Sequence, residues 1–210
     1  MSSDVATIYI VDDDAAARRS MEMLARMKGT NAIVFESAEA FIGHGVFEPY
    51  SCLIADLRLT GMSGLDLQQV MLEMGIDMPV IIVTGHGEVP SAVRAMENGA
   101  VVFLEKPCQP SELWSHIERA LESRMSSLNI RHVRALLKTR AQKLSDNERA
   151  VLQQMVAGKA NKVIASELDM GLRTVELRRA KVLQKMQADS VAELVRMAVI
   201  LGIDSGRKLA

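Results

Sequence analysis

The sequence has few cysteines and no long hydrophobic run. Its two cysteines, Cys52 and Cys108, provide neither a disulfide framework nor a cysteine metal centre, and we interpret both as reduced thiols. The four histidines are scattered and show no metal-ligand pattern. No apolar stretch approaches the roughly 18 residues that span a bilayer, and residues 1–7 lack the basic start and apolar core of a signal peptide. These absences predict a cytoplasmic protein without membrane contact.

The net charge of the 210-residue chain is only −1, but the charge is unevenly distributed. Residues 1–122 carry 8 Lys and Arg against 18 Asp and Glu, a net charge of −10, whereas residues 123–210 carry 17 against 8, a net charge of +9. This asymmetry indicates a basic half that meets a polyanion and an acidic half that holds a cation or a basic partner. The alternative is that the two halves simply attract each other.

The acidic half contains four short apolar runs, each followed closely by a reactive polar side chain. The runs are 8–11, 52–55, 80–83 and 101–104, and the side chains that follow them are Asp12 with Asp13, Asp56, Thr84 and Lys106. Continuous apolar runs are typical of strands that helices cover on both faces. Ligand sites of open parallel sheets lie beyond the carboxyl ends of the strands. We therefore expect three carboxylates, a hydroxyl and an ammonium to converge on one spot.

Helical patterns alternate with these runs. Residues 32–35 supply a fifth strand, and residues 38–46 the helix after it. Pro90 and Pro110 stand where the first turn of a helix tolerates a missing N–H. Strands that alternate with helices predict βαβ units and a parallel sheet, so residues 1–121 are expected to form an α/β domain of the (βα)5 type.

The basic half shows only helical patterns. Neither Pro nor Gly occurs from Leu121 to Leu144, so residues 122–143 are predicted to be a helical linker. Residues 144–210 then form an all-α domain, in which Ser145 and Glu148 make a capping box. A short helix at 161–169 and a longer one from Leu172, joined by a turn that contains Gly, predict a helix-turn-helix.

The expected carboxylate cluster has a definite chemistry. Crowded carboxylates stay ionised only if a positive charge compensates them, and Mg²⁺, which prefers oxygen ligands and bridges carboxylates to phosphates, is suited to this. A carboxylate can also attack phosphorus to form an aspartyl-phosphate. Lys106 and the Thr84 hydroxyl would then bind the phosphoryl oxygens.

The motifs of the acidic half resemble those of the receiver domain of two-component response regulators, whose fold is flavodoxin-like. They are Val11-Asp12-Asp13-Asp14, Asp56-Leu57-Arg58 with Met62-Ser63-Gly64, Thr84-Gly85-His86-Gly87 and Glu105-Lys106-Pro107. The resemblance implies that Asp56 is the phosphoacceptor and that Thr84 and Lys106 bind the phosphoryl group. It also implies a Mg²⁺ site formed by Asp12, Asp13, Asp56 and the backbone carbonyl of Arg58.

Phe103 occupies the place of the family's aromatic switch residue, although an ordinary core aromatic is the alternative. The chain also departs from the family pattern at three positions. Thr60 replaces a usual Pro, Val102 a common Asp, and Cys108 the Phe that usually follows Lys-Pro. No reacting group is lost, but a freer loop at Thr60 is expected to alter how fast the acyl phosphate forms or hydrolyses.

The basic half resembles the LuxR or NarL type of helix-turn-helix domain. The resemblance lies in Leu144–Arg149, Asn161–Ala165 and Thr174–Glu176, and Arg173-Thr174-Val175-Glu176 is similar to the FixJ branch. At 100° per residue, Val175, Val182 and Met186 pack inward. The expected DNA contacts are Lys162, Arg173, Thr174, Glu176, Leu177, Arg178, Ala180 and Lys181.

These DNA contacts differ in kind. Glu176 is expected to accept from cytosine N4 and Leu177 or Ala180 to touch a thymine methyl, whereas Arg173 and Lys181 take phosphate or guanine. Arg179 lies close to the buried side of the helix, so we expect it to pair internally, with Glu148 as a candidate partner; a DNA contact is the alternative.

Together the two resemblances imply a phosphorylation-dependent transcription regulator, not an enzyme. Its expected partners are a sensor histidine kinase, double-stranded DNA, RNA polymerase and, when phosphorylated, a second copy of the chain. The alternatives are a phosphorylated switch that binds protein or RNA, and a pseudo-receiver that is active without phosphorylation. A haloacid dehalogenase-type phosphatase is excluded, because it needs an Asp where Arg58 stands.

Overall fold

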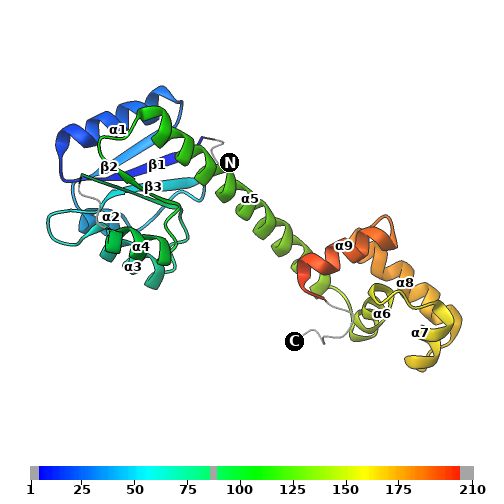
Figure 1. Ribbon diagram of the computed structural model, residues 1–210. Helices are drawn as coiled ribbons and strands as arrows, with labels where there is room; N and C mark the ends of the chain where they lie inside the picture. Colours follow the sequence, from blue (N-terminus) through cyan, green and yellow to red (C-terminus); the bar gives the residue numbers. More distant parts are fainter. Residues whose placement is uncertain (1–4, 86–88, 204–210) are drawn as a thin grey trace. The chain divides into compact units, whose positions relative to one another are not determined.

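The computed structural model describes residues 5–85 and 89–203 (Figure 1). Residues 86 and 87 of the third motif, including His86, therefore lie outside the described residues. Contacts between residues divide the chain into an α/β unit, residues 1–128, and a helical unit, residues 129–210. Each unit is described by itself.

The α/β unit is built on five parallel strands. They are β1 (Thr7–Val11), β2 (Asn31–Phe35), β3 (Ser51–Asp56), β4 (Val80–Thr84) and β5 (Val102–Glu105). The order across the sheet is β2-β1-β3-β4-β5, which is the flavodoxin-like order. The three central strands are buried along their whole length, which is why their sequences are continuously apolar. The predicted fold class is confirmed.

Helices cover both faces of this sheet (Figure 1). Their bounds are α1 (Ala15–Met27), α2 (Ala38–His44), α3 (Gly64–Glu73), α4 (Val89–Glu97) and α5 (Pro110–Gln142). Alternate side chains of each strand point to opposite faces. Tyr9 and Leu53 thus enter the core beneath α2, α3 and α4, whereas Ile8 and Ile54 enter the core beneath α1 and α5.

Local sequence signals set the helix ends near the sheet. The Asp14 side chain accepts from the Ala16 N–H and so caps α1, while Ser63 and Asp66 form a capping box at α3. Helix α2 ends at His44, two residues before the predicted end, because Gly45 takes a positive φ of 73°.

Up to residue 203, where the description ends, the helical unit contains the end of α5 and four further helices. They are α6 (Asp146–Val156), α7 (Asn161–Glu167), α8 (Leu172–Met186) and α9 (Val191–Leu201). The predicted capping box of Ser145 and Glu148 is present at α6. Helix α5 continues unbroken through Asn129, and the predicted linker limits at 121/122 and 143/144 stay predictions. In the described part of the chain, no helix is both long and apolar enough to cross a membrane.

Candidate functional site

The polar side chains that follow the apolar runs meet at one edge of the sheet. Asp12 follows β1, Asp56 ends β3, and Lys106 follows β5. The Lys106 Nζ lies 2.6 Å from Asp12 Oδ2 and 2.6 Å from Asp56 Oδ2, so one ammonium joins two carboxylates from neighbouring strands. The structure thus brings together residues 94 and 50 positions apart in the sequence.

Burial and backbone donors hold these two carboxylates in place. Asp12 is fully buried and Asp56 is 9% exposed. The Asp14 N–H donates to Asp12 Oδ1 at 2.9 Å, and the Arg58 N–H donates to Asp56 Oδ1 at 3.0 Å. Burial of the Lys106 ammonium lowers its pKa, but hydrogen bonds and attraction from the two carboxylates outweigh burial, so the pKa is raised overall. Lys106 therefore stays charged at neutral pH.

Thr84 and Phe103 lie on the two strands beside this cluster. Thr84 is completely buried at the end of β4, and its backbone carbonyl accepts from the Lys106 N–H at 2.7 Å. Phe103, on β5, is half-buried and packs against the core beneath α2, α3 and α4. Phe103 is thus partly in contact with the core and partly accessible to solvent.

Asp13 has a different partner from Asp12 and Asp56. Its Oδ2 accepts two hydrogen bonds from Thr60, one from the N–H at 3.0 Å and one from the hydroxyl at 2.8 Å. The Met62 N–H donates to Glu39 Oε1 at 3.0 Å, so the β3–α3 loop is attached at two points. Thr60 is thus hydrogen-bonded through both its hydroxyl and its N–H, while the expected effect of this position on the acyl phosphate stays a prediction.

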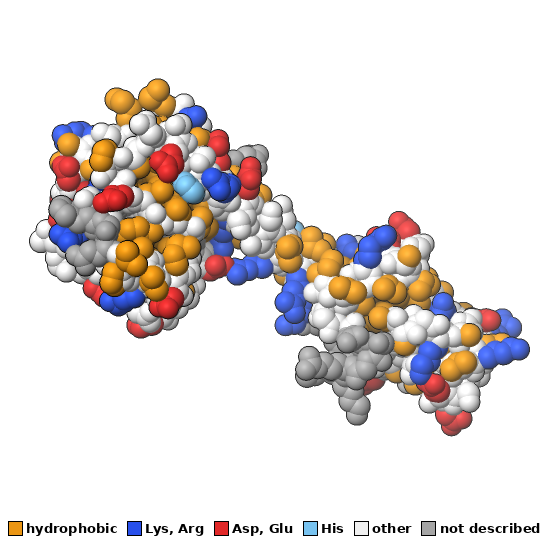
Figure 2. Space-filling view, in the orientation of Figure 1, with side chains coloured by type: hydrophobic (Ala, Val, Ile, Leu, Met, Phe, Trp, Pro, Cys, Tyr) orange, Lys and Arg blue, Asp and Glu red, His pale blue; other side chains and the backbone are white. Residues whose placement is uncertain are grey.

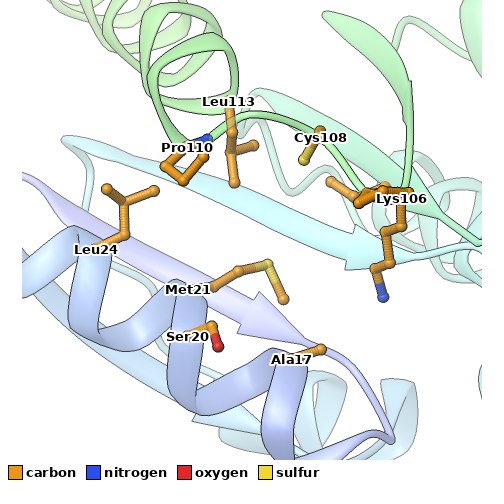
Figure 3. Close-up of a pocket in the computed structure, with 10 residues that line it drawn as sticks. Ala17, Ser20, Met21, Leu24, Lys106, Cys108, Pro110 and Leu113 are labelled. Atoms are coloured by element: carbon orange, nitrogen blue, oxygen red, sulfur yellow. The ribbon is translucent and has the colours of Figure 1, made fainter.

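An apolar hollow of about 340 Å³ lies beside Lys106, between α1 and the start of α5 (Figure 3). Met21 and Leu24 reach into it from α1, and Cys108 and Leu113 from the other side. Burial raises the pKa of the Cys108 thiol, so the sulfur remains protonated and behaves as a small apolar group.

A second candidate site lies on α8 of the helical unit. The side chains that face solvent there are Leu172, Arg173, Thr174, Glu176, Leu177, Ala180 and Lys181, and Lys162 is exposed on α7. Leu177 is 59% exposed, whereas Val175 and Val182 are fully buried on the opposite side. Figure 2 shows positive and negative side chains mixed at the end of this unit formed by α7 and α8. The exposed face is therefore mixed in charge, as the sequence predicts.

Two arginines of α8 differ from their neighbours. Arg178 is half-buried and its Nε is buried without a hydrogen-bond partner, so it is less available than the exposed residues around it. The expected Arg179–Glu148 pair does not form. The carboxylate of Glu148 instead accepts from Lys185 Nζ at 2.6 Å and from the Ser145 N–H at 2.8 Å. Lys185, near the end of α8, is the residue that approaches the start of α6.

Comparison with known proteins identifies the family to which each half of the chain is similar. Residues 8–118 match the family model of the response regulator receiver domain, and residues 142–198 match that of the bacterial regulatory proteins of the luxR family. The chain is a two-component response regulator. Membership of this family implies two kinds of partner, a histidine kinase and DNA. The family consists of transcription regulators, not of enzymes.

Several relatives resemble this response regulator along nearly its whole length. The transcriptional regulatory protein FixJ of Bradyrhizobium diazoefficiens is 40% identical over 196 residues, which cover 93% of this chain and 96% of the relative. FixJ of Rhizobium meliloti is 41% identical over 93% of this chain and 96% of the relative. Among solved structures, the response regulator StyR matches with a TM-score of 0.83 and 34% identity over 93% of this chain and 98% of the other. The regulator is thus FixJ-like, as its motifs indicate.

Receiver domains typically use Mg²⁺ for phosphorylation, and the donors of this response regulator suit that ion. Two carboxylates already share one cation, the Lys106 ammonium, at the ends of β1 and β3. Hard oxygen ligands of this kind are those that Mg²⁺ takes in proteins. Across residues 5–85 and 89–203, however, no three Asp, Glu, His or Cys side chains gather closely enough to hold a metal ion by themselves. Mg²⁺ does not require three, because it keeps several waters and uses one or two carboxylates.

Two contacts at these sites have no signal in the sequence. Thr60 carries no motif that pairs it with Asp13, 47 residues away, and nothing in the spacing of α8 selects Lys185 over Arg179 as the partner of Glu148. The position of Thr60 in the loop directly after a reactive strand is the only hint for the first.

Proposed function

We propose that this response regulator accepts a phosphoryl group on Asp56 from a sensor histidine kinase and that the modification controls dimerisation and DNA binding. In this proposal residues 1–121 are the receiver, 122–143 the linker and 144–210 the DNA-binding domain. The observation that carries it is the Lys106 ammonium, 2.6 Å from the carboxylate of Asp56. A fixed cation at that position favours the approach of a phosphoryl oxygen to the same carboxylate.

The transfer is a simple displacement. An Asp56 carboxylate oxygen attacks the phosphorus of a phosphohistidine, the new P–O bond forms as the P–N bond breaks, and the imidazole leaves with the electron pair and takes a proton. The residues proposed to hold Mg²⁺ are Asp12, Asp13, Asp56 and, through its backbone carbonyl, Arg58. When bound, Mg²⁺ offsets the negative charge of the phosphoryl oxygens.

Thr84 and Phe103 are proposed to report the presence of the phosphoryl group. The Thr84 side chain is buried, and the Thr84 backbone carbonyl is hydrogen-bonded to the backbone N–H of Lys106. A movement of Thr84 toward the phosphoryl group would therefore also displace the end of β5. The half-buried Phe103, two residues earlier on β5, can then move further into the core. Such a change between two packed arrangements is a usual means of switching.

Dimerisation is proposed to use apolar side chains exposed on the α/β unit. Val93 and Met96 of α4 are each 50% exposed, which leaves apolar surface available there. Trp114 is 7% exposed and belongs to the core, so it offers little surface to a second copy. Two copies of α8 would then contact two half-sites of a duplex, from which the regulator would act on RNA polymerase.

The proposed DNA contacts combine the exposed residues of α8 with Lys162 of α7. Arg173 and Lys181 are assigned to phosphate or guanine, Glu176 to cytosine, and Leu177 to a thymine methyl. Thr174, Ala180 and Arg178 complete the surface, with Arg178 contributing least because of its burial. A face of mixed charge supports sequence reading beyond phosphate attraction alone.

A single experiment tests the proposed mechanism. Three proteins are compared: the full native chain, Asp56→Asn and the control Asp77→Asn. Each is treated with Mg²⁺ and beryllofluoride, which mimics the phosphoryl group. The affinity of each protein for a duplex obtained by in vitro selection is then measured at several salt concentrations. We expect the native chain and Asp77→Asn to dimerise and bind more tightly, with a steep salt dependence, and Asp56→Asn to show neither response. If Asp56→Asn responds like the native chain, the mechanism is wrong.

A further inference from the structure

Thr60 places both of its hydrogen-bond donors on one oxygen of Asp13. The N–H lies 3.0 Å and the hydroxyl 2.8 Å from Asp13 Oδ2. Both residues are exposed, so the contact is open to ions from solvent. A proline, which is usual at this position in the family, would provide neither donor. This contact is therefore a property of the present chain.

Asp13 has a different hydrogen-bond partner from the other two carboxylates. Lys106 joins Asp12 to Asp56, whereas Asp13 is hydrogen-bonded to the β3–α3 loop. Within the described residues, no three acidic side chains form a group that holds a metal ion in this arrangement. A carboxylate oxygen that already accepts two hydrogen bonds, as Asp13 Oδ2 does, is a weaker ligand for a cation, because metal coordination and hydrogen bonding use the same lone pairs.

We infer that Thr60 competes with Mg²⁺ for the carboxylate of Asp13 and so weakens Mg²⁺ binding to the resting receiver. The inference rests on the proposed function, in which Asp13 is a Mg²⁺ ligand. Coordination through Oδ2 requires that the two hydrogen bonds to Thr60 be given up. Thr60 thereby raises the Mg²⁺ concentration at which the receiver becomes competent for phosphorylation.

The rest of the loop is held independently of this contact. The Met62 N–H is bonded to Glu39 Oε1, and Gly61 takes a φ of +90°, which turns the chain between the two attachment points. Loss of the Thr60 contact therefore releases Asp13 without releasing the loop.

The test is the Mg²⁺ dissociation constant of the full chain, measured from amide chemical shifts as MgCl2 is added. Thr60→Val removes the hydroxyl and is expected to bind Mg²⁺ about two- to tenfold more tightly, the range that corresponds to loss of one hydrogen bond. Thr60→Ser keeps the hydroxyl and should bind like the native chain. Thr139→Val, which removes a hydroxyl bonded to the Ala135 carbonyl on α5, is the matched control and should also be unchanged. If Thr60→Val binds Mg²⁺ equally or more weakly, the inference is wrong.

Asp13→Asn separates this inference from the proposed function. It should weaken Mg²⁺ binding, and in the Asp13→Asn background Thr60→Val should give no gain, because the gain acts through Asp13. If Asp13→Asn binds Mg²⁺ like the native chain, Asp13 is not a ligand, and both the metal assignment and the inference fail. If Asp13→Asn binds weakly and Thr60→Val gives no gain alone, only the inference fails. Thr60→Ala serves in place of Thr60→Val if the latter does not give a folded-protein spectrum.

Discussion

Substitution of Gly64 should disturb the proposed phosphoacceptor, Asp56, without replacing a reactive side chain. Gly64 begins α3, and its N–H donates to the Leu57 carbonyl at 3.0 Å. A Cβ at this position would lie 2.2 Å from the Asp56 carbonyl oxygen and 3.2 Å from the Leu57 Cα. Ordinary contact begins near 3.4 Å, so Gly64→Ala forces the end of β3 and the start of α3 apart by more than 1 Å.

The expected cost has two parts. Forcing an extra methyl into a packed junction destabilises a protein by about 1–3 kcal/mol, which urea unfolding of the full chain would detect. A displacement of about 1 Å at a reacting group can lower reactivity by roughly 100-fold, which the rate of Asp56 phosphorylation by acetyl phosphate with Mg²⁺ would detect. Phosphorylated and unphosphorylated chains are separated on a phosphate-affinity gel.

Gly43→Ala is the matched control for this substitution. Gly43 lies in α2, its added Cβ would meet no heavy atom within 4 Å, and its φ is not positive. Alanine there should leave phosphorylation unchanged and stabilise the chain by about 0.5–1 kcal/mol through helix propensity. If Gly64→Ala is phosphorylated as fast as Gly43→Ala, the junction of β3 and α3 does not set the position of Asp56 and our reasoning is refuted.

Three further predictions concern other parts of the chain. Hydrogen bonds from a lysine and a backbone N–H lower the pKa of Glu148 in the folded chain. The ionised carboxylate therefore stabilises the fold fully above the unfolded pKa of about 4.3, and this stabilisation is lost as the pH falls through the lower folded pKa. Hydrogen exchange in α8 should become faster between pH 6 and 3, and this change should be much smaller in Glu148→Gln. Burial raises the pKa of Cys52 to about 12 and also raises the pKa of Cys108. Iodoacetamide at pH 8 should therefore label the native chain slowly and only at Cys108, which peptide mass spectrometry can measure. Labelling of Cys52 would contradict its burial. Lys162→Ala should weaken binding to all duplexes alike and reduce the slope of log affinity against log salt by about 1, whereas a change confined to one sequence would show that Lys162 reads bases.

The α/β fold and the strand ends were predictable because one physical cause determines both. Strands β1, β3 and β4 lie in the middle of the sheet and are covered on both faces, so almost every side chain in them must be apolar. The first polar residue after such a run marks where the strand leaves the core. Asp12 and Asp56 were therefore located by the pattern, whereas Lys106 comes one residue after Glu105, the first polar residue of its run, and was singled out by its motif. Parallel pairing brings the three strand ends to one edge of the sheet, where the Lys106 Nζ lies 2.6 Å from an oxygen of each aspartate.

Contacts made by loops and long side chains were not predictable in the same way. The approach of Thr60 to Asp13 depends on the path of the β3–α3 loop, which no periodic pattern describes. On α8, Arg179 and Lys185 are both long cations near the buried side, and only the packing of α8 against α6 selects Lys185 for Glu148. Periodicity assigns a side chain to a face of a helix, but not to one partner on that face.

Charge balance links these contacts to the proposed switch. The side chains of Asp12, Asp13 and Asp56 carry three negative charges and that of Lys106 one positive charge, which leaves −2 on these four side chains. A phosphoryl group would add between about −1.5 and −2 at neutral pH, so a divalent cation is needed before the group can be retained there. Thr60 offers Asp13 two neutral donors, which stabilise its charge without cancelling it. Thr60 can therefore take the place of the cation while the receiver rests, but it cannot do so once the phosphoryl group is present.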